Sequence, residues 1–241
     1  MCTRFIRSIL LILGLSLASM PACATIIQTL SGVSSVGNPV SFKAELTIAG
    51  DILTVQLFNL SPQSSAAPND LLSSYFFDII NGSSRPSLNY VSAVGDVYLA
   101  KKSSADTLQT ANANIKAVNN NDNSWAFRGD LNIALIPFLK YGIGTVGNNN
   151  FTPNNFNGNI VDGMDYSIYT GDVTTQNLHN KLLVKNMATF TFSGLTGFSE
   201  ANIASAFSFG MGTAPDSLLT CPEPATLALL GLGGLLLRRR K

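Results

Sequence analysis

The sequence has little charge, and its middle part has no surplus of positive charge. Only 12% of the 241 residues are charged. Residues 25–220 contain nine Lys and Arg against thirteen Asp and Glu, which gives this part a net charge of −4. A protein that binds duplex nucleic acid needs a dense basic patch facing the phosphates. The sequence therefore excludes nucleic acid as a partner.

Histidine is almost absent, and this excludes the commonest catalytic arrangements. His179 is the only histidine, and it lies in a polar segment, residues 174–181, that is typical of a loop. A hydrolytic triad needs a base beside its nucleophile, and a zinc site needs several histidine or cysteine ligands. We interpret His179 as a surface residue, and we expect neither an enzyme nor a cofactor.

The first 24 residues have the order of a secretory signal peptide. Arg4 and Arg7 precede an apolar run over residues 8–17, and the small residues Ala22 and Ala24 follow. A positive region, about ten apolar residues and a small-x-small site together predict export, with cleavage directly after Ala24. A buried N-terminal helix is the alternative.

Cysteine is also scarce. Cys2 and Cys23 lie within the predicted signal peptide, so only Cys221 remains in the mature chain and no intrachain disulfide can form. The fold must therefore depend on its packed core and on backbone pairing. An alternative interpretation makes Cys23 the acylated first residue of a lipoprotein, but Met20 and Pro21 do not fit that pattern.

The C-terminal residues 221–241 form a second special segment. Residues 225–237 carry no charge and precede a basic end, made of Arg238, Arg239, Arg240 and Lys241. A helix of thirteen residues spans about 20 Å, less than the roughly 30 Å of a hydrocarbon core. Snorkelling of the basic side chains and local thinning of the bilayer can absorb the difference, and the basic end would stay in the cytoplasm. We therefore expect a short transmembrane helix that serves as a transient anchor in the inner membrane.

Pro222, Glu223 and Pro224 stand where this anchor begins. Proline lacks an N–H group and fixes φ, so this tripeptide stays extended and accessible to a processing enzyme. Followed by the apolar stretch and the basic end, it resembles the PEP-CTERM sorting signal. The resemblance implies processing by exosortase, a membrane-embedded transpeptidase-like enzyme, in a Gram-negative bacterium that makes exopolysaccharide. An ordinary tail anchor with a chance Pro-Glu-Pro is the alternative.

Between the two signals, short strands alternate with turn residues. Residues 41–48 and 52–60 alternate apolar and polar side chains on either side of Gly50-Asp51, which predicts a hairpin. Further strands are expected at residues 73–80, 90–100, 125–127, 132–139, 182–192 and 203–209. Residues 108–118 are the best candidate for a helix, with an irregular strand or loop as the alternative. This pattern favours an all-β fold: a single, jelly-roll-like β-sandwich domain over residues 25–220.

The body also resembles the XDD-type exosortase-dependent surface proteins, a subgroup of the same class. The resemblance extends over short pieces of residues 51–224, namely residues 51–59, 68–72, 75–78, 142–145, 150–151, 161–166 and 206–210. It implies no known activity.

A loop rich in Gly and Asn, residues 147–163, raises the question of a ligand. Calcium prefers oxygen ligands, which Asn157, Asn159, Asp162 and Asp165 could supply, as could Asn121 and Asp122 elsewhere. Turn formation explains the same residues, and a glycosidase pair made of Asp162 and Asp165 is a further alternative. The nearby aromatic residues could stack on sugars or lie in the core: Phe151, Tyr166 and Tyr169.

These patterns together predict a protein that is exported and processed by exosortase. We expect a surface or extracellular-matrix protein without catalytic activity that associates with exopolysaccharide. The alternative is a calcium-dependent carbohydrate-binding module or adhesin.

Overall fold

A computed structural model describes residues 24–102, 104–116, 124–133, 135–145, 164–173, 175–213 and 217–220. Within these residues there are strands and three short 3-10 turns but no α-helix, which confirms the all-β prediction. The strands are β1 (Thr25–Val33), β2 (Pro39–Ala49), β3 (Ile52–Asn59), β4 (Leu72–Phe77), β5 (Asn89–Leu99), β6 (Thr107–Asn114), β7 (Ala126–Arg128), β8 (Tyr141–Gly144), β9 (Ile168–Tyr169), β10 (Leu182–Ser193), β11 (Ser208–Met211) and β12 (Leu218–Thr220). The 3-10 turns are η1 (Pro68–Asp70), η2 (Gln176–Leu178) and η3 (Glu200–Asn202).

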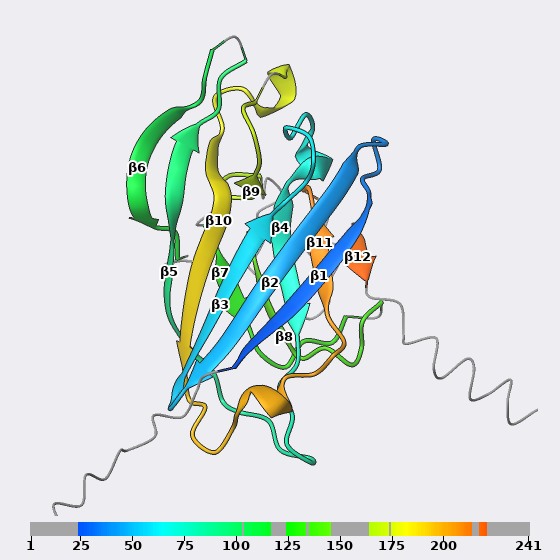
Figure 1. Cartoon of the computed structure of the whole chain (residues 1–241), viewed down its shortest axis with the longest axis vertical. Coiled ribbons are helices and arrows are strands. Elements are labelled where there is room, and N and C mark those ends of the chain that lie inside the picture. The colour runs from blue at the N-terminus through cyan, green and yellow to red at the C-terminus, as the bar shows by residue number, and fades with distance from the viewer. Residues whose placement is uncertain are drawn as a thin grey trace, which may run out of the picture.

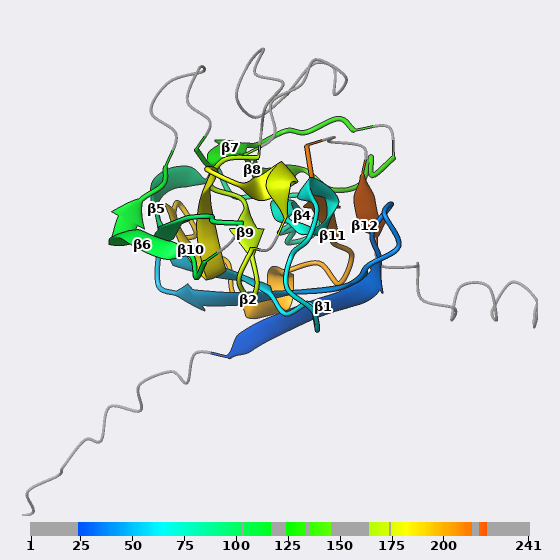
Figure 2. The same cartoon turned by 90° about the horizontal axis from the view of Figure 1, so that it is seen from above.

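The strands form two packed layers, as in a sandwich (Figure 1). The front sheet has the order β1-β2-β3-β10-β5-β6, and each neighbouring pair is antiparallel. The back sheet has the order β12-β11-β4-β8-β7. Figure 2 shows β1 and β2 in one layer and β4, β7 and β8 in the other. The short strand β9 pairs with β10 and with β4, and so connects the two layers.

The β2–β3 hairpin forms as predicted. Its turn contains Gly50 at φ +62°, in the left-handed region that glycine adopts most readily. Burial alternates along both strands, so one side chain in two points into the core. These buried residues of β2 are Val40, Phe42, Ala44, Leu46 and Ile48.

Aromatic side chains fill the space between the layers. The rings of Phe42 on β2 and Phe209 on β11 lie 5.8 Å apart, and those of Trp125 and Phe190 lie 4.9 Å apart. Such pairs stabilise a core beyond the area they bury. The core therefore holds the two sheets face to face without a disulfide.

Three sequence predictions are wrong in detail. Residues 107–114 form the irregular strand β6, the alternative to the helix expected at 108–118, because β5 offers backbone partners along this segment. Residues 132–139 form tight turns instead of a strand among their described positions: Ile136 N donates to Ile133 O and Leu139 N to Ile136 O. Their apolar side chains cover Phe76, on the outer side of β4. The strand expected at 203–209 begins only at Ser208.

A buried polar cluster connects the two layers near β9, and we call it the polar seam. The side chain of Asn59, at the end of β3, donates to Asp70 O and to Ile168 O, both at 3.0 Å. The Asp70 carboxylate, 2% exposed, accepts four hydrogen bonds, from Ser34 Oγ, Asn38 Nδ2 and the N–H groups of Ala66 and Ala67. The seam therefore attaches the β1–β2 turn, the end of β3, β9 and η1 to one another.

Asp70→Ala tests the polar seam. We expect the free energy of unfolding to fall by about 2–4 kcal/mol, because the substitution leaves buried donors without an acceptor. The control is Asp172→Ala, since Asp172 is 55% exposed and pairs with Lys185 at the surface; its effect should stay within about 0.5 kcal/mol. Urea unfolding measures both, and equal effects would contradict the assigned role.

Candidate functional site

The predicted sorting residues flank the described domain. β1 begins at Thr25, directly after the predicted cleavage position, and β12 ends at Thr220. Ala24 is described and exposed. Ala22 and the tail residues 221–241, which include Pro222, Glu223, Pro224 and the basic end, lie outside the described residues. No helix in the described part is long and apolar enough to cross a membrane, and the predicted span at 225–237 is outside it.

Most of the predicted calcium ligands also lie outside the described residues: Asn157, Asn159, Asp162, Asn121 and Asp122. Asp165 is described and half-buried. The described residues contain no group of three His, Cys, Asp or Glu side chains that could hold a metal ion. The structure therefore brings no calcium site together in the part that it describes.

The described residues include two of the aromatic residues that could stack on sugars, Tyr166 and Tyr169, and the single histidine, His179. Tyr169 is completely buried, which favours the core interpretation over sugar stacking. Tyr166 is half-buried and its backbone oxygen accepts a hydrogen bond from Trp125 Nε1 at 2.8 Å. Nδ1 of His179 accepts a hydrogen bond from the backbone N–H of Lys102 at 3.2 Å. Phe151 lies outside the described residues.

A pocket that the sequence did not reveal opens beside β7 and β8. Its volume is about 430 Å³, within the range of small-ligand sites. Three segments that are distant in the sequence form it: residues 85–88 before β5, residues 127–130 at the end of β7, and Tyr141 at the start of β8. The lining residues are Arg85, Pro86, Ser87, Leu88, Phe127, Gly129, Asp130 and Tyr141.

An ion pair fixes the arginine of this pocket. Arg85 Nε lies 3.0 Å from Oδ1 of Asp78, and Arg85 Nη2 lies 2.8 Å from Oδ2. The side chain of Asp78 is 6% exposed and also accepts the N–H of Ile79. Hydrogen bonding to Asp78 raises the pKa of Arg85, so the guanidinium stays charged. A paired, two-point contact holds it in one orientation at the pocket wall.

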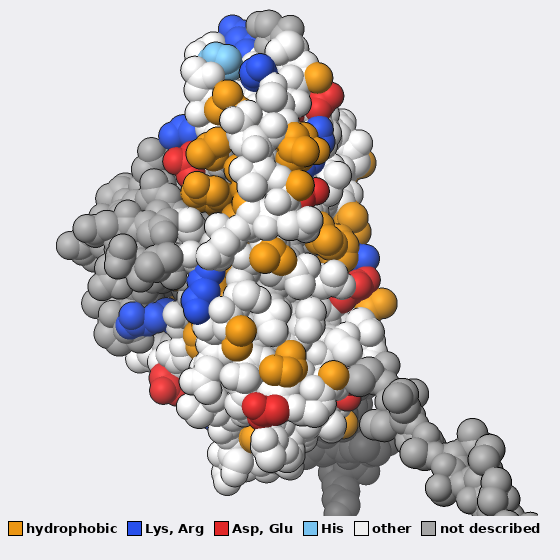
Figure 3. Space-filling view, turned by 90° about the vertical axis from the view of Figure 1, so that its left-hand side faces the viewer, with side chains coloured by type: hydrophobic (Ala, Val, Ile, Leu, Met, Phe, Trp, Pro, Cys, Tyr) orange, Lys and Arg blue, Asp and Glu red, His pale blue; other side chains and the backbone are white. Residues whose placement is uncertain are grey.

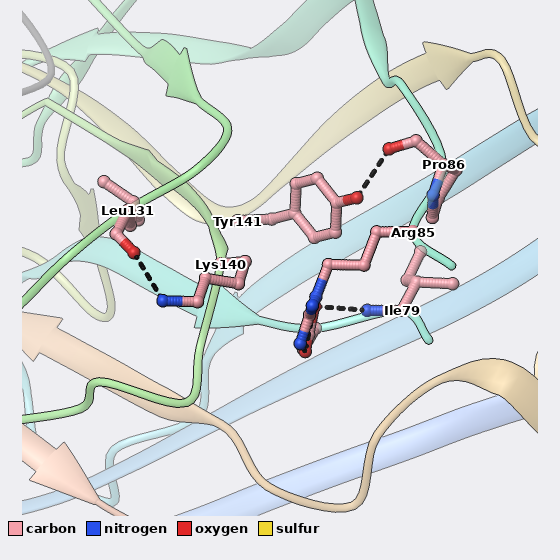
Figure 4. Close-up of polar contacts among 7 residues, drawn as sticks. Ile79, Arg85, Pro86, Leu131, Lys140 and Tyr141 are labelled. Carbon is pink, nitrogen blue, oxygen red and sulfur yellow. Dashed lines mark hydrogen bonds and ion pairs between the residues drawn. The ribbon is translucent and has the colours of Figure 1, made fainter. Parts of the chain in front are cut away.

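Tyr141 forms another wall. Its hydroxyl donates to the backbone oxygen of Pro86 at 2.5 Å (Figure 4). Its ring stacks on that of Phe127, with 6.3 Å between the ring centroids. Burial, with a smaller contribution from Asp78, raises the pKa of Tyr141 to about 12. The phenol therefore stays protonated at neutral pH and does not act as a base.

The lining combines apolar rings with a few polar groups. Asp130, exposed and at φ +56°, brings a carboxylate near the guanidinium, and Ser87 brings a hydroxyl. Glycoside hydrolysis uses two carboxylates, whereas Asp78 is held by Arg85 and Asp130 is the only carboxylate in the described lining. This arrangement suits the binding of a small ligand that carries many hydroxyl groups.

On the face shown in Figure 3, Lys and Arg side chains are scattered and do not gather into a patch. This distribution agrees with the net charge of the body, which does not favour a polyanionic partner.

Comparison with known proteins identifies one segment. Residues 220–241 match the family model described as the PEP-CTERM protein-sorting motif. The predicted processing tripeptide and basic end lie within the matched residues, so the recognition of this signal is confirmed. No curated protein and no solved structure matches the chain. The narrower resemblance to the XDD-type subgroup stays a prediction.

Tyr141→Phe should change the dependence of stability on pH. An unfolded tyrosine ionises near pH 10, while the pKa of folded Tyr141 is about 12. Between pH 10 and 12 Tyr141 holds its proton in the folded protein and loses it in the unfolded chain. The contribution of this group to the free energy of unfolding is therefore fully present below about pH 10 and is lost as the pH rises toward 12. At pH 8 the free energy of unfolding of the variant should be about 1 kcal/mol lower, because Phe cannot form the hydrogen bond to Pro86.

The slope is the diagnostic quantity in this experiment. Between pH 10 and 12 the free energy of unfolding should fall with pH in both proteins. The slope of the variant should be smaller by up to about 1.4 kcal/mol per pH unit. Burial also raises the pKa values of Tyr75, Tyr90 and Tyr169, so a slope remains in both proteins. Urea titrations at several pH values measure it, and parallel curves would show that Tyr141 is not responsible.

Proposed function

We propose that this protein, an exosortase-dependent exported protein that carries the PEP-CTERM sorting motif, is a non-catalytic component of the cell surface or extracellular matrix that associates with exopolysaccharide. The observation that carries the proposal is the position of the motif. It begins at Thr220, the last residue of β12, so it overlaps the strands of the described part at this one residue only.

Sorting would proceed in three steps. The predicted signal peptide directs the body across the inner membrane of a Gram-negative host. The hydrophobic tail then anchors the chain transiently, with its basic end in the cytoplasm. Exosortase cleaves near Pro222, Glu223 and Pro224, beyond every strand in the described domain, so cleavage keeps all the strand pairing of the described residues.

The pocket beside β7 and β8 supports association with a polysaccharide. Sugars present hydroxyl groups to polar side chains and C–H faces to apolar surfaces, and Asp130, Ser87 and Arg85 lie there beside apolar side chains. Charged partners form stronger hydrogen bonds than neutral ones. Because the body has a net charge of −4, a neutral polysaccharide is favoured over an acidic one.

Processing can be tested by mass spectrometry of the surface-associated protein. In wild-type cells we expect a C-terminus close to Pro222, without Arg238 to Lys241. Cells without exosortase, or cells that carry Ala at positions 222–224, should retain the intact tail in the membrane fraction. An intact tail on protein at the surface of wild-type cells would contradict the proposal.

Binding can be tested on the processed protein with the host's purified exopolysaccharide. Asp130→Ala and Ser87→Ala should each weaken binding by about tenfold, since each removes one hydrogen bond that is worth about 1.4 kcal/mol. Asp172→Ala is the matched control, because Asp172 is exposed and does not line the pocket. Equal binding by all variants would exclude the pocket as the binding site. Repeating the measurement with a calcium chelator would show whether binding needs calcium.

A further inference from the structure

The two layers end in four edge strands. The front sheet ends at β1 and β6, and the back sheet ends at β7 and β12. An edge strand presents unpaired N–H and C=O groups, on which another strand can pair. Proteins normally shield such edges by making the strand short, by placing charge or proline on it, or by bulges.

Three of these four edges are shielded. β7 and β12 contain three residues each. β6 has two breaks in its register with β5, and within it Asn112 adopts φ +48°. The N–H of Asn112 is taken by the Asp96 side chain at 2.8 Å. These bulges bend β6 and interrupt the row of groups that another strand would need.

β1 has none of these protections. It contains nine residues, all in continuous register with β2, and has neither a charged residue nor a proline. It lies at the border of the front layer (Figures 1 and 2). Its odd-numbered residues form the outer side and are exposed, with Ile27 61% and Val33 63% exposed. Among the residues that the structure describes, β1 is therefore a long, regular and open edge.

The inner side of β1 is firmly packed. Gln28 is buried, donates from Nε2 to Ala204 O at 2.9 Å and accepts the hydroxyl of Tyr75. At Gly32 the chain approaches Leu219 so closely that a Cβ atom would lie 2.6 Å from a methyl carbon. The edge is thus held in place by the core, and a partner strand would meet a preorganised template.

We infer that β1 pairs with β1 of a second copy of this chain, antiparallel about a twofold axis, so that the two front sheets become one. Self-pairing through a twofold axis brings the same strand against itself. Like charges that face each other destabilise such a pair, and β1 has no charged side chain that could do so. The absence of charged side chains along nine residues therefore favours a second copy over a charged partner.

The side-chain alternation restricts the register. Outer residues must face outer residues, because a shift by one residue would turn every side chain to the wrong face. A register centred on Thr29 pairs all nine residues and places Thr29 opposite Thr29 and Ile27 opposite Ser31. Hydroxyl pairs of this kind already join β1 to β2: Thr25 Oγ1 lies 3.0 Å from Thr47 Oγ1, and Ser31 Oγ lies 2.9 Å from Ser41 Oγ.

Disulfide trapping tests this register in cells that export the full chain. The Cys221→Ser background leaves the mature protein without cysteine. Thr29→Cys should then give a disulfide-linked dimer on a non-reducing gel, because the twofold axis brings residue 29 against itself. Ile27→Cys alone should give little dimer, since four residues at about 3.3 Å each separate it from its mate, beyond the roughly 7 Å limit for a disulfide.

Two further arms complete the experiment. Co-expression of Ile27→Cys with Ser31→Cys should restore the dimer, and Thr110→Cys on the bulged β6 should not form one. Failure to cross-link at Thr29, or equal cross-linking at Thr110, would overturn the inference. Surface protein is quantified in every strain, so a failure of export, which would contradict the proposed function, is recognised separately from a failure to pair.

Discussion

The two layers of this protein depend on one buried carboxylate. Asp70 accepts hydrogen bonds from the β1–β2 turn and from its own loop, while its backbone oxygen accepts the amide of Asn59. Asn59 also holds β9, the strand that pairs with both sheets. No disulfide can perform this task in the mature chain, since only one cysteine follows the predicted signal peptide. A fully satisfied polar cluster specifies one arrangement of the layers in a way that an apolar contact does not.

The aromatic core supplies the remaining cohesion. The rings between the layers come from both sheets, so neither sheet has a buried face without the other. β4 is buried along its whole length, and apolar side chains from the turns at residues 131–139 cover its outer residue Phe76. This second cover explains why the back sheet can be short and still be firmly packed.

The parts of the fold that follow local rules were predictable from the sequence. The β2–β3 hairpin follows from strict alternation around Gly50, and β10 follows from the same pattern. The strand β6 was not predictable in this way, because its small residues suit several conformations and only its pairing with β5 selects a strand.

The pocket was not predictable either. Arg85, Asp130 and Tyr141 follow no common sequence pattern, and only the packing of β7 and β8 against the loop before β5 brings them together. Asn59 and the Pro68–Asp70 segment share no sequence pattern, and only the fold brings the side chain of Asn59 within 3.0 Å of the backbone oxygen of Asp70.

The position of β12, the last strand of the described residues, has a mechanical consequence. Any attachment made through the processed C-terminus would transmit force to the body through β12, which pairs with β11 at three positions only. Such a short strand would peel away under tension while the front sheet and the aromatic core stayed folded. A protein held in this way would have a compliant last strand between a rigid body and its point of attachment.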